Sequence, residues 1–150
     1  MSDTLTLTRL YNAPRERVWK AWTDPGQLAK WWGPDGFTTP RCELDVRPAG
    51  MLRIDMRAPD GKVLPLTGVY REVVAPERLV FLCSALDGNG ALIFEVLNTI
   101  TFAKQGGKTK LTVQTQVLRK TPGAAEGQVE GWTQTLVRLE QFLDNKQRKK

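Results

Sequence analysis

The sequence of 150 residues contains no histidine. Histidine is the side chain that most often acts as a general base near neutral pH, and it is the commonest protein ligand of transition metals. Its absence excludes a Ser-His-Asp triad and a Cys-His pair. Asp, Glu, Lys or Tyr could still catalyse a reaction, so it stays open whether the protein is an enzyme. No catalytic constellation is visible, and we predict no catalytic residue, no metal site and no cofactor.

Cysteines and long hydrophobic runs are also scarce. Cys42 and Cys83 lie far apart and form no CxxC pair, which argues against zinc and gives no disulfide framework. We expect buried free thiols. No apolar run approaches the roughly 18 to 20 residues that span a bilayer, and the N-terminus lacks the basic-then-apolar pattern of a secretory signal. The sequence therefore predicts a cytoplasmic protein without membrane insertion.

The chain is basic, with a net charge of +6 and an isoelectric point of about 9.6. Such a balance raises the question of a nucleic-acid partner. However, Lys146, Arg148, Lys149 and Lys150 lie within the last five positions, where a solvated helix end explains them. Acids and bases interleave elsewhere, and no nucleic-acid motif is present. We predict no nucleic acid among the partners.

The composition fits one globular domain over residues 1–150, since 41% of the residues are hydrophobic and 25% are charged. Residues 4–11 alternate threonine with leucine, the period of a half-buried strand. Pro14 then suits the first turn of a helix. The apolar stripe of that helix consists of Val18, Trp19, Ala21 and Trp22.

A second short helix is predicted to follow at once. Asp24 can cap it, and Gln27 three residues later completes a capping box. Gly33 and the proline after it end this helix. Trp31 and Trp32 are adjacent, so on a helix they point about 100° apart. We therefore expect only one of them to be fully buried, with Trp32 nearer the rim of a cavity.

Six further strands come next, separated by short turns. The Asp60-Gly61 pair is a strong hairpin signal between two of them. Regular spacing of this kind predicts an antiparallel sheet of about seven strands, counting the N-terminal one. The expected strands cover residues 42–46, 51–58, 63–74, 78–86, 92–103 and 108–120.

After residue 122 the apolar period changes to that of a long helix of about five turns. Its stripe consists of Val129, Trp132, Leu136, Leu139 and Leu143. The large sheet is the available partner for this stripe, and a strongly twisted sheet curls around what it packs on. The predicted architecture is α+β, a helix-grip fold in which a curved sheet surrounds the C-terminal helix.

Three glycines recur at four-residue intervals where this helix should begin. Either the helix starts late, near residue 126 or after, or the glycines leave open volume beside a portal. They are Gly123, Gly127 and Gly131.

Several segments resemble the START-like (SRPBCC) superfamily, in the branch named for the activator of the heat-shock-protein-90 ATPase. They are LTRLYNAPRERVWKAWTDPGQLAKWW at residues 7–32, RPAGMLRI at 47–54, DGKVLPLTGVYREVVAPERLVF at 60–81 and the Gly131-Trp132 pair. The resemblance covers nearly the whole chain. Family members typically carry Gly-Gly where this chain has Ala49-Gly50, a departure that affects a turn.

The resemblance implies a cavity, because that superfamily includes lipid and sterol carriers, hormone receptors, polyketide cyclases, antibiotic-resistance proteins and a co-chaperone module. We predict that an apolar small molecule, such as a lipid, polyketide or aromatic metabolite, binds between sheet and C-terminal helix. One alternative is a cyclase- or hydrolase-type enzyme using the same cavity. Another is a co-chaperone-like protein-interaction module. A homodimer is compatible with so small a domain.

The candidate ligand-binding residues are Trp32, Met56, Tyr70, Phe81, Phe94, Val96, Asn98, Trp132 and Leu136. Asn98 is the polar member of an apolar strand face, so its amide either satisfies a neighbouring group or meets a ligand. Tyr70 and Glu72 should share a face, and the Tyr70 hydroxyl either meets a ligand or lies at the edge of the core. The enzyme alternative requires Tyr70, Asn98 or a buried glutamate among Glu95, Glu130 and Glu140 to converge in the cavity.

Overall fold

The computed structural model describes residues 3–86, 89–120 and 128–148. The order of the elements is the predicted one: a strand, two helices, six strands and a final helix. The elements are β1 (Asp3–Tyr11), α1 (Arg15–Thr23), α2 (Pro25–Trp31), β2 (Thr38–Leu44), β3 (Met51–Arg57), β4 (Val63–Val74), β5 (Arg78–Leu86), β6 (Leu92–Gln105), β7 (Lys108–Lys120) and α3 (Gln128–Arg148).

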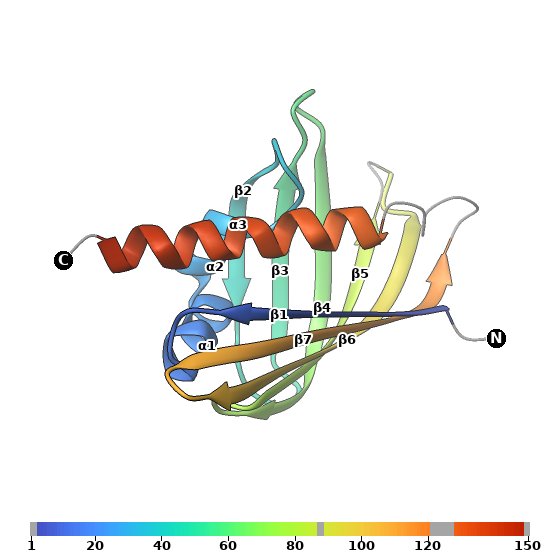
Figure 1. The fold of residues 1–150 in the computed structure, drawn as a ribbon. Helices are drawn as coiled ribbons and strands as arrows, with labels where there is room; N and C mark the ends of the chain where they lie inside the picture. The colour runs from blue at the N-terminus through green and yellow to red at the C-terminus, as the bar shows by residue number, and fades with distance from the viewer. Residues whose placement is uncertain (1–2, 87–88, 121–127, 149–150) are drawn as a thin grey trace.

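The seven strands form one antiparallel sheet in the order β1-β7-β6-β5-β4-β3-β2. The sheet curves, and α3 lies across its concave side, while α1 and α2 lie at the end where α3 finishes (Figure 1). This is the predicted helix-grip fold. Alternation along β3 shows how the sequence produces it, because Leu52, Ile54 and Met56 are buried and Arg53 and Asp55 point outward.

The predicted stripe of α3 packs into the core. Leu136, Leu139 and Leu143 are buried in the same cluster as the inner face of the sheet. The Tyr11 hydroxyl donates a hydrogen bond of 2.9 Å to the carbonyl oxygen of Leu136, and Arg17 donates to that of Leu143. Helix α3 is described from Gln128 on; where it starts relative to the three glycines is untested, since residues 121–127 lie outside the described residues, as does the side chain of Val129.

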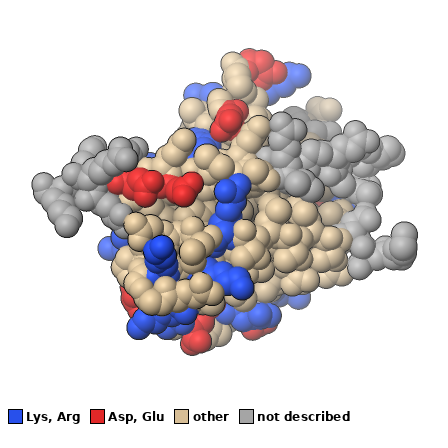
Figure 2. Space-filling view, viewed as in Figure 1, with Lys and Arg blue, Asp and Glu red and all other residues tan. Residues whose placement is uncertain are grey.

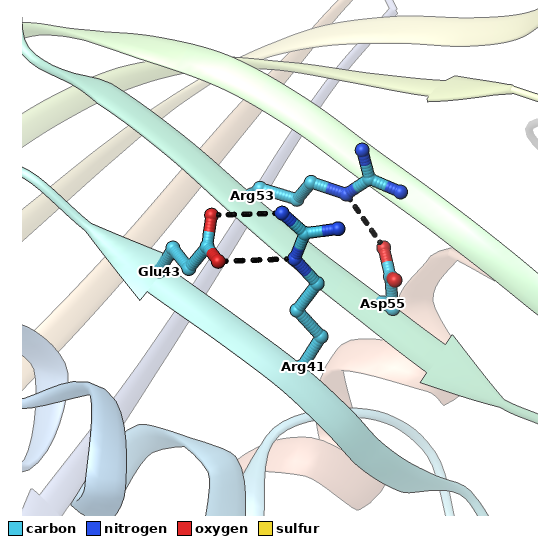
Figure 3. Close-up of polar contacts among 4 residues, drawn as sticks. All are labelled: Arg41, Glu43, Arg53 and Asp55. Carbon is cyan, nitrogen blue, oxygen red and sulfur yellow. Dashed lines mark hydrogen bonds and ion pairs between the residues drawn. The ribbon is translucent and has the colours of Figure 1, made fainter.

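Charged side chains alternate on the outer face of β2 and β3. Arg41 pairs with Glu43 at 3.1 Å along β2, and Arg53 pairs with Asp55 at 3.1 Å along β3 (Figure 3). The strand register also places Arg41 opposite Asp55 and Glu43 opposite Arg53. Exposed ion pairs contribute little stability. Their alternation favours one register, and charges on an edge strand oppose pairing with another chain.

A close approach of backbones fixes β4 beside β3 and β5. A Cβ at Gly68 would lie 1.8 Å from the carbonyl oxygen of Leu82, so only glycine fits there. The turn before β3 docks on β4, because the Ala49 amide donates to the Tyr70 carbonyl and the Tyr70 amide donates to the Gly50 carbonyl, both at 2.8 Å. Ala49 has a φ of 70°, a left-handed backbone that an alanine rarely adopts.

Three local predictions are wrong, each for a structural reason. Strand β2 starts at Thr38 rather than residue 42, because a bulge lets Thr38 pair with Arg57 across the edge. Tyr70 is buried and Glu72 is exposed, because a second bulge between them reverses the alternation. The cap of α2 lacks the Gln27 half of the box; instead Asp24 Oδ1 accepts the Gly26 amide at 3.1 Å.

Basic and acidic side chains are interspersed on the face in Figure 2, with an uncharged stretch over β1 and β7. Among the described residues, no helix is both long and apolar enough to cross a membrane.

Candidate functional site

A pocket of about 260 Å³ lies beneath the N-terminal half of α3. The loop after α2 contributes Trp32, Gly33, Pro34 and Phe37. Helix α3 contributes Gly131, Trp132 and Thr135. The inner face of the sheet contributes Met56, Leu66, Cys83, Phe94, Val96 and Asn98.

Tryptophans form one wall of the pocket. The rings of Trp32 and Trp132 meet edge to face, with centroids 5.7 Å apart. Behind them Trp22 stacks on Trp132 at 6.3 Å and contacts Trp31 at 4.8 Å. Trp19 packs on Phe102 at 5.2 Å, away from the pocket. Residues from α1, the end of α2 and α3 thus pack these rings together in one aromatic cluster.

Both adjacent tryptophans are buried, Trp31 with 0% and Trp32 with 6% of its surface exposed. The prediction that only one could be buried is wrong, because α2 ends at Trp31 and Trp32 has an extended backbone (φ −68°, ψ 139°). The helical angle between them therefore does not apply. Trp32 lines the pocket. Trp31 does not line it, and its indole N–H donates to the carbonyl oxygen of Ala21 at 3.1 Å.

Asn98 is the polar side chain on the pocket's sheet wall. Its Oδ1 accepts a hydrogen bond of 2.8 Å from the hydroxyl of Thr115, which faces inward from the neighbouring strand β7. Among the described residues, the Asn98 amide nitrogen has no hydrogen-bond partner. The amide oxygen of Asn98 is therefore bonded to Thr115, and its two N–H groups remain available to a ligand in the pocket.

Cys83 and Thr135 also line the pocket, and neither side chain is ionised near neutral pH. Burial raises the pKa of the Cys83 thiol to about 12, so it stays protonated. The Thr135 hydroxyl donates to the carbonyl of Gly131 at 2.8 Å, one turn earlier in α3. A protonated, buried thiol is a poor nucleophile.

An arginine ties the loop beside the pocket to α3. Arg138 Nη1 donates to the carbonyl oxygens of Trp32, Gly33 and Pro34 at 3.1, 2.9 and 3.0 Å. The Asp35 amide also donates to Gln134 Oε1 at 3.1 Å. These bonds satisfy carbonyls at and after the end of α2 and hold the loop over the pocket.

The chain matches the family described as Activator of Hsp90 ATPase homolog 1-like protein over residues 12–144. It belongs to this family. The predicted branch of the START-like superfamily is thereby confirmed. A comparison with curated proteins finds no match.

Solved structures of bacterial proteins share the fold. A Chromobacterium violaceum protein is 30% identical, with a TM-score of 0.79, and the match covers 92% of this chain and 94% of that one. A Rhizobium leguminosarum protein is 27% identical, with a TM-score of 0.81 and coverage of 97% and 96%. The AHSA1 protein of Silicibacter pomeroyi, 22% identical over 95% and 99% with a TM-score of 0.82, shows the fold alone.

Within this START-like fold, six of the nine candidate ligand-binding residues line the pocket: Trp32, Met56, Phe94, Val96, Asn98 and Trp132. The other three are buried elsewhere in the core. Tyr70 and Phe81 pack on each other with centroids 6.0 Å apart, and Leu136 follows the pocket-lining Thr135 on α3.

Sequence reasoning missed the loop residues Gly33, Pro34 and Phe37, the strand residues Leu64 and Leu66, and the small residues Cys83 and Thr135. The four-residue glycine spacing did point to Gly131, which lines the pocket; Gly123 and Gly127 lie outside the described residues. A loop gives no periodic signal, so only the tertiary structure shows that it borders the pocket.

The convergence that the enzyme alternative requires is not found in the part of the chain that the structure describes. Tyr70 lies outside the pocket, and burial raises its pKa. Glu95 lies on the outer face, where it accepts from Ser84 at 3.1 Å and pairs with Arg119 at 3.2 Å. Glu140 is exposed, and the side chain of Glu130 is not described. Within the described ranges, no three His, Cys, Asp or Glu side chains form a metal-binding group.

Proposed function

We propose that this protein binds a compact apolar molecule in the pocket between the sheet and α3. The observation that carries the proposal is the pocket itself, which is lined by aromatic, aliphatic and sulfur-containing side chains around a small number of polar groups. Ligand sites in proteins have this composition. The packed tryptophan rings give a ligand a large apolar surface to contact.

The volume limits the size of the ligand. An apolar cavity of about 150 Å³ holds one benzene molecule. By proportion, 260 Å³ accommodates about ten non-hydrogen atoms. The expected ligand is therefore a one- or two-ring aromatic metabolite or a short acyl chain, and the pocket is too small for a sterol or a complete lipid.

Gly131 offers a direct test. A Cβ there would meet only Pro34 Cγ, at 4.0 Å, so a larger side chain can enter the pocket without displacing backbone. Gly131→Phe adds a ring about as large as benzene, which fills much of the volume. Gly131→Ala is the matched control, since it also replaces the helical glycine, with a gain in helix propensity of about 1 kcal/mol, and leaves most of the pocket open.

Native mass spectrometry after mild purification and thermal-shift screening of small hydrophobic molecules would measure binding. A ligand at a hundred times its dissociation constant stabilises a protein by about 2.7 kcal/mol. We expect shifts for wild type and Gly131→Ala and none for Gly131→Phe. Ligands that stabilise Gly131→Phe as much as wild type would bind elsewhere and would refute the proposal.

A further inference from the structure

One polar side chain on the sheet wall of the pocket, Asn98, has free hydrogen-bond donors. Asn98 is only 2% exposed, yet it lines the pocket, and its amide nitrogen has no partner in residues 3–86, 89–120 and 128–148. The Thr115 hydroxyl donates to the amide oxygen at 2.8 Å, which fixes the orientation of the amide. The two N–H bonds of Asn98 are thus left for whatever occupies the pocket.

Trp32 supplies a second unpaired donor. Its ring lines the pocket at the end of α2, but its indole nitrogen is fully buried and has no hydrogen-bond partner among the described residues. A buried donor without an acceptor costs free energy, and native proteins leave few of them. The Trp32 nitrogen is fully buried, so the Asn98 amide is the donor that a ligand in the pocket can reach.

Charged groups are missing from the described part of the same lining. The oxygen of Asn98 accepts from Thr115, and the Thr135 hydroxyl, which donates to its own helix, can still accept a hydrogen bond. None of the described lining residues is charged. An ionised ligand would therefore lose its hydration without gaining an opposite charge.

We propose that the ligand carries an uncharged hydrogen-bond acceptor of the carbonyl class, which the Asn98 amide recognises, on a compact planar apolar frame. This inference rests on the proposed function and names the substrate class of the same pocket. A site built to bond a polar group discriminates against analogues that lack it, because its own donors then stay unpaired. Thr115 is a positioning residue, since it acts through the oxygen of Asn98.

Two probe molecules of equal size test how much the carbonyl group contributes to binding. Acetophenone and α-methylstyrene have the same number of non-hydrogen atoms and differ in C=O against C=CH₂. The ketone is better hydrated, so the informative quantity is how the ratio of their dissociation constants changes between two proteins. Isothermal titration calorimetry measures both constants for each protein.

The second protein is Asn98→Leu/Thr115→Val. Removing both partners of a buried hydrogen bond with side chains of similar shape keeps the fold close to its original stability. We expect the preference for acetophenone over α-methylstyrene to fall by about tenfold in this variant, the size of one hydrogen bond. A preference that changes by less than about twofold would overturn the inference.

Nuclear magnetic resonance distinguishes direct contact between Asn98 and the ligand from a purely structural role of Asn98. In wild type, acetophenone should shift the side-chain amide signals of Asn98 downfield, and α-methylstyrene should not. Benzoate, again of equal size, should bind more weakly than acetophenone at neutral pH. Tighter binding of benzoate would contradict an uncharged ligand.

The outcomes separate this inference from the proposed function. If neither probe binds wild type, or both bind Gly131→Phe equally well, the proposed function fails and the inference fails with it. If both bind wild type and are excluded by Gly131→Phe, but the preference is unaltered in the double variant, the function stands and the carbonyl class is wrong.

Discussion

Replacing Arg138 with methionine should loosen the loop that borders the pocket. Arg138 Nη1 donates to the carbonyl oxygens of Trp32, Gly33 and Pro34, all between 2.9 and 3.1 Å. Methionine keeps most of the aliphatic volume of arginine and removes every donor. The substitution therefore tests the hydrogen bonds of this side chain with little change in packing.

The geometry sets the size of the effect. Hydrogen bonds to a charged group contribute about 1.5–3 kcal/mol each. Here two N–H bonds of one nitrogen serve three acceptors, and the side chain is partly exposed, so water replaces part of what is lost. We expect a loss of about 2 kcal/mol in the free energy of unfolding. For a domain of this size that lowers the melting temperature by roughly 4–8 °C.

Urea unfolding would measure the stability, and hydrogen exchange would locate the change. The Phe37 amide, which donates to the carbonyl of Pro34 at 3.1 Å, should exchange faster in Arg138→Met. Arg119→Met is the matched control, since among the described residues Arg119 pairs with Glu95 alone and 67% of its side chain is exposed. The reasoning is refuted if Arg138→Met costs no more than Arg119→Met.

Three further predictions concern stability. Ala49→Gly should stabilise the protein by about 1 kcal/mol in urea unfolding, because glycine removes the strain of a φ of 70°. Gly68→Ala should destabilise it by about 3 kcal/mol or more, because its Cβ would lie 1.8 Å from the Leu82 carbonyl oxygen. Burial raises the pKa of Cys83 to about 12, so unfolding should become easier as pH rises above about 9. In that range the unfolded thiol loses its proton and the folded one keeps it. Unfolding curves of Cys83→Val should be less sensitive to alkaline pH than those of wild type.

Each of these has a result that would count against it. A loss of stability in Ala49→Gly would mean that the left-handed turn is not strained. A native-like Gly68→Ala would mean that β4 and β5 can separate at little cost. Equal alkaline slopes for wild type and Cys83→Val, taken from urea curves between pH 8 and about 10.5, would mean that Cys83 ionises in the folded state.

Local periodicity explains why the elements could be predicted. The alternation of β3 and the three- and four-residue steps of Leu136, Leu139 and Leu143 arise from the geometry of strand and helix, so they are visible in sequence. The same alternation placed Phe94, Val96 and Asn98 on one inward face, where the structure has them lining the pocket. Asn98 stood out because it is polar where its neighbours are apolar.

Bulges and element ends explain the errors. One inserted residue after Tyr70 sends Glu72 outward, and a bulge depends on how β4 pairs with β5 rather than on β4 alone. Likewise the end of α2 at Trp31 allows Trp32 to fold back onto Trp22 and Trp132. Neither event changes the hydrophobic pattern enough to be read in advance.

The amino-acid sequence by itself determined the order of the elements, their buried faces and the family, because these depend on residues close together in the chain. Only the tertiary structure decided that Thr115 orients the Asn98 amide, that Arg138 holds the loop after α2, and that α3 leaves about 260 Å³ open above the sheet. The physical reason is that hydrogen bonds between distant residues and the space between packed side chains exist only once the whole chain has folded.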